Sequence, residues 1–223
     1  MKLLIVDDHP VVRAGLRRLL AAEPGLAIVE TASGQEAVAT FCETRPDLVL
    51  LDLNLPGISG LEVLGRLLIE DPKARVIVIS MYDNPVYVAR VLEAGARGYV
   101  SKNAPPEQII EAVRRVAAGR SYIEPEMAQE LALGNIRPAS QLSQLSSREL
   151  EILRLLADGS SLTEIAEAIG VSYKTVANQC TQLKAKLATP RIADLIRVAI
   201  SHGFGRGAPQ LAAPLAAPDK TGG

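Results

Sequence analysis

Five polar residues with complementary chemistry stand at or within two positions of the ends of short apolar runs: Asp7, Asp8, Asp52, Ser80 and Lys102. Carboxylates can hold a divalent cation, and one carboxylate can act as a nucleophile toward phosphorus. A lysine and a hydroxyl can neutralise and bind the oxygens of a transferred phosphoryl group. This chemistry requires a fold that brings residues so distant in sequence to one place.

The first 120 residues alternate apolar runs with helical patterns, and five such repeats are visible. The apolar runs are residues 3–6, 27–29, 48–51, 76–79 and 99–100. The helical patterns are residues 11–22, 35–43, 61–70, 85–94 and 106–118. Strands that alternate with helices predict a parallel sheet covered on both faces. We therefore expect a doubly wound, five-stranded parallel α/β sheet of the flavodoxin-like type.

In such a sheet, functional groups gather at the carboxyl ends of the strands, where all five polar residues are expected. Three carboxylates at one edge repel each other, so a divalent cation is the physical expectation. Oxygen ligands that leave positions open for water suit Mg²⁺. Aspartate and serine also end strands in many proteins without any site. A purely structural role is a good explanation for any one of these residues, but a poorer one for all five together. We therefore expect a phosphoryl pocket.

The chain changes character after residue 120. We expect a domain over 1–120, a linker over 121–144 with one short helix at 125–133, and a helical domain over 145–203. The Gly/Ala/Pro-rich tail 204–223 lacks amphipathic periodicity, which predicts disorder.

The predicted C-terminal domain is small and entirely helical, with helices at 147–158, 162–169, 173–187 and 191–201. Ser146 and Glu149 have the spacing of a capping box, and Ser172 can cap the third helix. Two helices joined by a short turn with Gly170 have the form of a helix-turn-helix. On the third helix, an apolar stripe predicts that Cys180 is a core residue. A polar helix face can simply meet water, and composition alone favours that reading for the opposite side.

The first 120 residues resemble the receiver domain of two-component response regulators. The matching motifs are Asp7-Asp8, Leu51-Asp52-Leu53-Asn54-Leu55-Pro56-Gly57 and Tyr99-Val100-Ser101-Lys102. The resemblance implies that Asp52 is the phosphorylated aspartate. It also implies that Asp8, Asp52 and the Asn54 backbone carbonyl bind Mg²⁺ directly, and that Asp7 acts mainly through water.

The same resemblance gives three residues a role in the switch. Lys102 pairs with the phosphoryl group, and Ser80 donates a hydrogen bond to it. Tyr99 is the aromatic residue that turns inward when Ser80 moves. His9, beside the acidic pair, is interpreted as a solvent-facing residue at a helix start.

Residues 145–201 resemble the LuxR-type helix-turn-helix, and a receiver followed by this module is the architecture of the NarL/FixJ subfamily. The resemblance implies that the segment 162–181 reads DNA. The candidate DNA-binding residues are Lys174, Thr175, Ala177, Asn178, Thr181, Gln182, Lys184 and Lys186. It also implies a histidine kinase as phosphodonor, DNA as a partner, and a homodimer after phosphorylation.

Three departures affect the output module. Ala177 stands where the family usually has a basic residue, Gln179 where histidine is frequent, and Leu162-Thr163 where Asn-Lys is common. Seven basic and six acidic residues between 145 and 201 leave a charge of only +1. Because non-specific affinity comes largely from phosphate neutralisation, one copy should bind DNA weakly and two copies would offset the shortage.

Composition sets the remaining expectations. A net charge of −1, no signal-peptide pattern, no membrane-length apolar run and two widely spaced cysteines predict a cytoplasmic protein with reduced thiols. We expect a phosphorylation-dependent transcriptional regulator and not an enzyme. One alternative is an aspartate-nucleophile phosphatase, which would need a second acid–base residue and a cap over the substrate. Another is a regulator whose output domain binds protein, with weakened DNA contact.

Overall fold

The computed structural model describes residues 1–81, 84–133, 141–202 and 204. The strands are β1 (Lys2–Val6), β2 (Ala27–Thr31), β3 (Leu48–Asp52), β4 (Val76–Ser80), β5 (Gly98–Ser101) and β6 (Tyr122–Ile123). The helices between them are α1 (Pro10–Leu20), α2 (Gly34–Thr44), α3 (Gly60–Glu70), α4 (Pro85–Glu93) and α5 (Pro106–Ala117). The remainder is helical, with α6 (Pro125–Ala132), η1 (Gln141–Gln144), α7 (Ser147–Ala157), α8 (Leu162–Ala168), α9 (Tyr173–Lys186) and α10 (Ile192–Ser201). Of the predicted tail, only Phe204 lies within the described residues.

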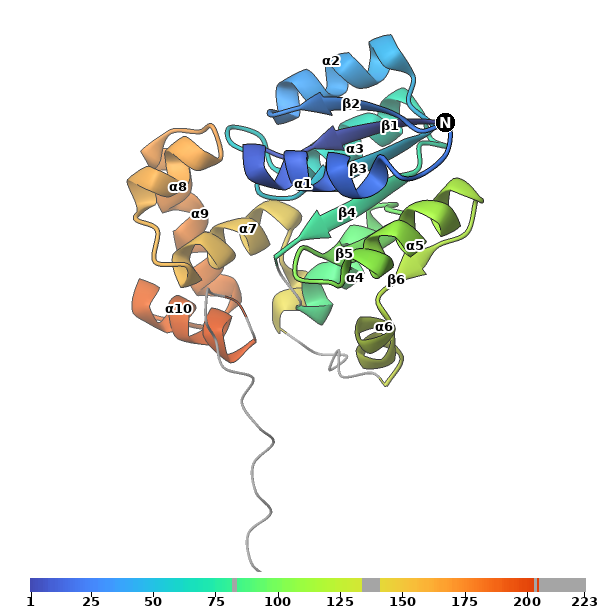
Figure 1. Ribbon diagram of the computed structural model, residues 1–223. Coiled ribbons are helices and arrows are strands. Elements are labelled where there is room, and N and C mark those ends of the chain that lie inside the picture. Colours follow the sequence, from blue (N-terminus) through green and yellow to red (C-terminus); the bar gives the residue numbers. More distant parts are fainter. Residues whose placement is uncertain (82–83, 134–140, 203, 205–223) are drawn as a thin grey trace, which may run out of the picture.

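The strands form one parallel sheet in the order β2-β1-β3-β4-β5-β6. One face packs against α1 and α5, and the other against α2, α3 and α4 (Figure 1). β3 and β4 are buried along their whole length because both faces of these central strands are covered. The predicted doubly wound α/β sheet is confirmed.

The prediction of five strands is wrong by one. β6 pairs in parallel with the β5 edge, with Tyr122 opposite Gly98 and Ile123 opposite Tyr99. Two residues are too few to give an alternating pattern, and they lie in a stretch that resembles a linker by composition. The Glu124 carboxylate then accepts a hydrogen bond from the Ser101 amide, which fixes the end of β6 against β5.

In the C-terminal helical module, α7–α10, serine side chains cap the starts of the first three helices. Ser146 and Glu149 make the predicted capping box at α7, and Ser172 accepts the Thr175 amide at the start of α9. Ser161 and Glu164 make a second capping box at α8. Cys180 is buried in the module core as predicted, and burial raises the pKa of its thiol.

The strand arrows of β1 and β4 point toward the side of the α/β domain where the helical module lies (Figure 1). The carboxyl edge of the sheet therefore faces the module. This arrangement places the predicted phosphoryl pocket and the helical output in one region of the molecule.

Candidate functional site

Asp7 and Asp52 lie side by side at the carboxyl edge of the sheet, and both side chains are 0% exposed. Lys102 joins them, because its Nζ lies 2.6 Å from Asp7 Oδ2 and 2.7 Å from Asp52 Oδ2. The Lys102 side chain is only 8% exposed. Three residues predicted from separate strand ends thus form one buried ion cluster. The Lys102 ammonium group is close enough to contact an oxygen of a group attached to Asp52.

Burial and pairing act in opposite directions on the ionisation of this cluster. Burial raises the pKa of Asp52, and the attraction of Lys102 only partly offsets it. Burial would lower the pKa of Lys102, but Asp52 and Asp7 outweigh it and raise that pKa above its usual value. Lys102 therefore stays protonated and keeps a positive charge beside Asp52. That charge is what a developing phosphoryl group requires.

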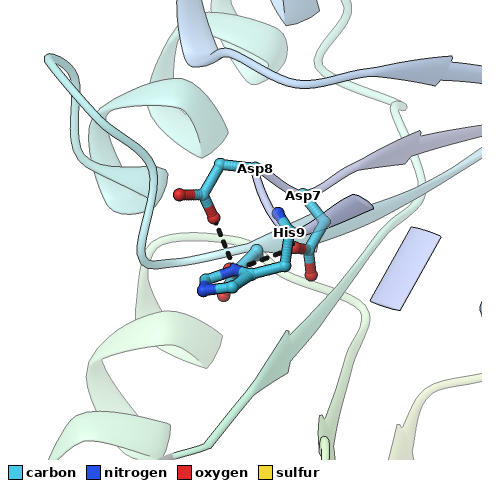
Figure 2. Close-up of side chains that lie close together, drawn as sticks. Asp7, Asp8 and His9 are labelled. Atoms are coloured by element: carbon cyan, nitrogen blue, oxygen red, sulfur yellow. Dashed lines mark hydrogen bonds and ion pairs between the residues drawn. The ribbon is translucent and has the colours of Figure 1, made fainter. Parts of the chain in front are cut away.

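Asp8 and His9 lie beside Asp7 (Figure 2), and their side chains are more exposed than those of the buried cluster. His9 Nδ1 lies 2.7 Å from Asp8 Oδ1 and 3.3 Å from Asp7 Oδ1. The His9 amide also donates to Asp7 Oδ1 at 2.8 Å. His9 precedes the first residue of α1 and its side chain is 59% exposed, so the expected helix-start position holds. Its ring, however, contacts the acidic pair.

The pocket fits a divalent cation. One donor atom from each of Asp7, Asp8, His9 and Asp52 lies within 4.8 Å of the others. Asp8 Oδ1 is buried and has no hydrogen-bond partner among the described residues. A buried carboxylate oxygen in this condition is costly unless a cation or water reaches it. Asp7, Asp8 and Asp52 would hold a cation, which would supply charge neutralisation at the phosphoryl oxygens.

The remaining predicted residues of the pocket are present around this cluster. The Asn54 amide donates to Asp52 Oδ1 at 3.2 Å, which orients the carboxylate. Ser80 is fully buried at the end of β4, the strand next to β3. Tyr99 lies on β5, the strand next to β4, and its side chain is also buried.

The β3–α3 loop, residues 53–59, connects this pocket to the helical module. The Gly57 amide donates to the Ala168 carbonyl at the end of α8, at 2.9 Å. Gly170 has a φ of +68°, and a Cβ there would lie 2.5 Å from the Gly57 oxygen. Glycine is therefore required at 170 both for the backbone turn and for this close approach.

Other contacts surround that hydrogen bond. Ser59 caps α3 and also hydrogen-bonds to Glu151 of α7, and burial raises the pKa of the Glu151 carboxyl. Arg90 of α4 donates to the Leu145 carbonyl at 2.9 Å. The Asn84 side chain donates to the carbonyl of His202, and the Tyr87 and Phe204 rings meet edge to face at 6.4 Å. Sequence reasoning missed this interface, because none of these residues follows a recognisable motif.

The predicted DNA-binding residues lie on α9 and remain accessible beside this interface. Lys174, Thr175, Asn178, Thr181, Gln182 and Lys186 are exposed, while Ala177 and Lys184 are partly exposed. Lys186 also pairs with Glu149 of α7 at 2.7 Å. Burial alone would raise the pKa of Glu149, but Lys186 and Ser146 lower it below its usual value. This pair fixes α9 against α7 while the polar face of α9 stays open.

Comparison with protein families gives the assignment. Residues 3–114 match the response regulator receiver domain, and residues 143–199 match the bacterial regulatory proteins of the luxR family. The chain belongs to the response regulators. Response regulators with this pair of domains are NarL/FixJ-type, phosphorylation-dependent, DNA-binding transcriptional regulators and not enzymes.

Relatives cover nearly the whole response regulator. The chain is 42% identical over 209 residues to the transcriptional activator protein ExaE of Pseudomonas putida. This match covers 92% of the present chain and 98% of ExaE. The chain is 36% identical to response regulator UvrY of Escherichia coli, covering 92% and 95% of the two chains. Among solved structures, RcsB of Salmonella enterica bound to a promoter with phosphomimetic BeF3⁻ matches with a TM-score of 0.69 and 25% identity. That match covers 90% of this chain and 98% of RcsB.

Membership of this family decides between the earlier alternatives. The helical module of the response regulator has DNA as its target, so neither the phosphatase nor the protein-binding alternative is retained. Within the described residues, no helix has the length and apolar character that crossing a bilayer requires.

Proposed function

We propose that Asp52 accepts a phosphoryl group from a histidine kinase with the help of Mg²⁺. The observation that carries this proposal is the buried contact of Lys102 with both Asp52 and Asp7. Lys102 is thus a cationic group beside the nucleophile Asp52. The carboxylates of Asp7, Asp8 and Asp52 form a further site for a cation. Asp8 and Asp52, with the Asn54 carbonyl, would hold Mg²⁺ directly, and Asp7 would act through water.

During transfer, an Asp52 carboxylate oxygen attacks phosphorus in line with the leaving nitrogen of the donor's phosphohistidine. The new P–O bond forms as the P–N bond breaks, so the product is an acyl phosphate. Lys102 Nζ neutralises an equatorial oxygen, and the Ser80 hydroxyl donates a hydrogen bond to the attached group. Tyr99, buried on the neighbouring strand, would act as the switch aromatic that turns inward when Ser80 moves.

The β3–α3 loop would carry this change to the output module. It begins directly after Asp52, and its Gly57 amide bonds to α8. A phosphoryl group on Asp52 changes the charge and hydrogen bonds at the start of this loop. We propose that this weakens the contacts of Gly57 and Ser59 with the module, which shifts the population toward a released form that binds DNA as a homodimer.

The exposed polar face of α9 gives this regulation a particular form. Lys174, Asn178 and Gln182 are accessible while the module is held against the receiver. Contact with the receiver therefore leaves the DNA-reading face of α9 uncovered. Its main effect would be to restrict how the modules of two copies can be placed on adjacent half-sites of DNA. A further solved structure of the relative RcsB contains two dimers bound to two parallel DNAs, and a dimer of this chain is part of our proposal.

The proposed domains are a receiver over 1–120, a linker over 121–144, and a DNA-binding module over 145–203. We also propose that the protein acts in the cytoplasm, together with its DNA and kinase partners.

The test is selection of genomic DNA fragments by the full chain with and without a small phosphodonor. Phosphodonor with Mg²⁺ should increase the bound DNA for the wild type and leave Asp52→Asn unchanged. Equal stimulation of both proteins would contradict the proposal.

A further inference from the structure

The His9 ring occupies an unusual position for an exposed residue. Its Nδ1 lies 2.7 Å from Asp8 Oδ1 and 3.3 Å from Asp7 Oδ1 (Figure 2). A single N–H bond can point along only one of these directions. The Asp7 contact has the geometry of a hydrogen bond, whereas Asp8 Oδ1 is left without a hydrogen-bond partner among the described residues. His9 Nδ1 and Asp8 Oδ1 therefore lie close together without a hydrogen bond between them.

This convergence is the geometry of two ligands of one ion. Neighbouring ligands of an octahedral divalent cation lie about 3.0 Å apart when each is about 2.1 Å from the ion. The two separations from His9 Nδ1 fall on either side of that value. All separations within the group are within 4.8 Å, not far above the roughly 4.2 Å between opposite ligands. Small side-chain movements would complete the set.

We propose that His9 Nδ1 is a ligand of the divalent cation in the acidic pocket, in place of one water molecule. This inference rests on the proposed cation site of Asp8 and Asp52. It gives the site a mixed oxygen and nitrogen donor set. Imidazole favours transition metals such as Ni²⁺, while an all-oxygen set suits Mg²⁺. His9 thereby makes the receiver more receptive to a divalent transition metal than its carboxylates alone would.

The position of His9 on the chain supports this role. It stands between the acidic pair and Pro10, which begins α1, so the helix start fixes its backbone. Its amide bond to Asp7 Oδ1 further orients the residue toward the pocket. Its side chain makes no capping hydrogen bond to α1, so removing the ring should leave the helix intact. The ring is thus positioned by the backbone yet dispensable for folding.

The chain contains only two histidines, which makes a spectroscopic test specific. Full-length protein labelled with ¹⁵N-histidine and loaded with Mn²⁺ is measured by electron spin echo envelope modulation. Wild type and His202→Ala should both show ¹⁵N coupling to the ion, and His9→Ala should lose it. Retained coupling in His9→Ala, or no coupling in a wild type that binds Mn²⁺, would overturn the proposal.

Calorimetric titration gives a second readout. His9→Ala should weaken Ni²⁺ binding by at least about tenfold, the lower end of what loss of a ligand-supporting group costs. Its Mg²⁺ affinity should change much less, whereas His202→Ala should match the wild type for both ions. An equal loss for both ions would give His9 a general role and overturn the inference. Failure of the wild type to bind either ion would instead refute the proposed cation site itself.

Discussion

The Gly57 amide donates a 2.9 Å hydrogen bond to the Ala168 carbonyl, and so joins the loop after Asp52 to the first helix of the helix-turn-helix. Only four residues lie between Asp52 and Gly57 along the chain. A change at the phosphoryl pocket therefore has a short covalent path to the output module. The contact gives the coupling between input and output a physical location that can be altered by mutation.

Gly170→Ala should release the module from the receiver. The added Cβ would lie 2.5 Å from the Gly57 oxygen, and the positive φ adds strain of about 1 kcal/mol. Gly159→Ala is the matched control, because it has a φ of +88° but nothing within 4 Å of its Cβ position. Hydrogen exchange at the Gly57 amide should accelerate in Gly170→Ala alone. Equal acceleration in both variants would mean that backbone strain, and not the contact, is responsible.

Contact between the domains should weaken as the pH rises. Burial raises the pKa of Glu151 from its ordinary value of 4.5, so the packed state binds this proton more tightly than the released state. The stabilisation is fully present below 4.5 and is lost as the pH rises through the raised value. The protection factor of Gly57 should fall across that window.

Substitution distinguishes Glu151 from other titrating groups near it. Arg148, Arg154 and Ser59 surround its carboxylate. Glu151→Gln should flatten the pH dependence of Gly57 protection, and Glu164→Gln, at the exposed start of α8, should leave it unchanged. An unchanged pH profile in Glu151→Gln would rule out this carboxyl as the cause.

Lys102→Ala should destabilise the receiver in the absence of divalent cation. The substitution leaves two buried carboxylates without their counter-charge, which typically costs about 3–5 kcal/mol. Mg²⁺ should recover part of the loss by supplying charge to the same pocket. Urea unfolding with and without Mg²⁺ measures both effects, with exposed Lys73→Ala as the control. A Lys102→Ala protein as stable as the control would contradict the buried pair.

Lys174→Ala should reduce the salt dependence of DNA binding. If Lys174 contacts a phosphate, its removal lowers the slope of log affinity against log salt by about 0.9. Titration of a labelled duplex over a salt series measures this slope. Lys73→Ala, on the receiver, should retain the wild-type slope. A Lys174→Ala slope equal to that of the wild type would remove this residue from the DNA contact.

The sequence predicts most of the site because its residues obey a simple rule. Asp52 and Ser80 end β3 and β4, Asp7 and Lys102 directly follow β1 and β5, and neighbouring parallel strands end at one edge of the sheet. The contact between Gly57 and Ala168 could not be predicted, since it depends on how two separately patterned domains pack. Glu151 likewise has the sequence context of a surface helix, although the structure buries it beside Ser59.

Two smaller features were missed for different reasons. The Ser161 and Glu164 capping box has a recognisable spacing and could have been found by the same rule that identified Ser146 and Glu149. β6 has no such signal, because pairing of Tyr122 and Ile123 with β5 depends on tertiary contacts.

The most direct test of the account is the site of phosphorylation. Intact-mass and peptide-mass measurements follow the full chain after incubation with phosphoramidate and Mg²⁺. The account predicts one phosphoryl group on the peptide that contains Asp52, its loss on chelation of the metal before the reaction, and no adduct in Asp52→Asn. An adduct of the same extent in Asp52→Asn would contradict the assignment of Asp52 as acceptor.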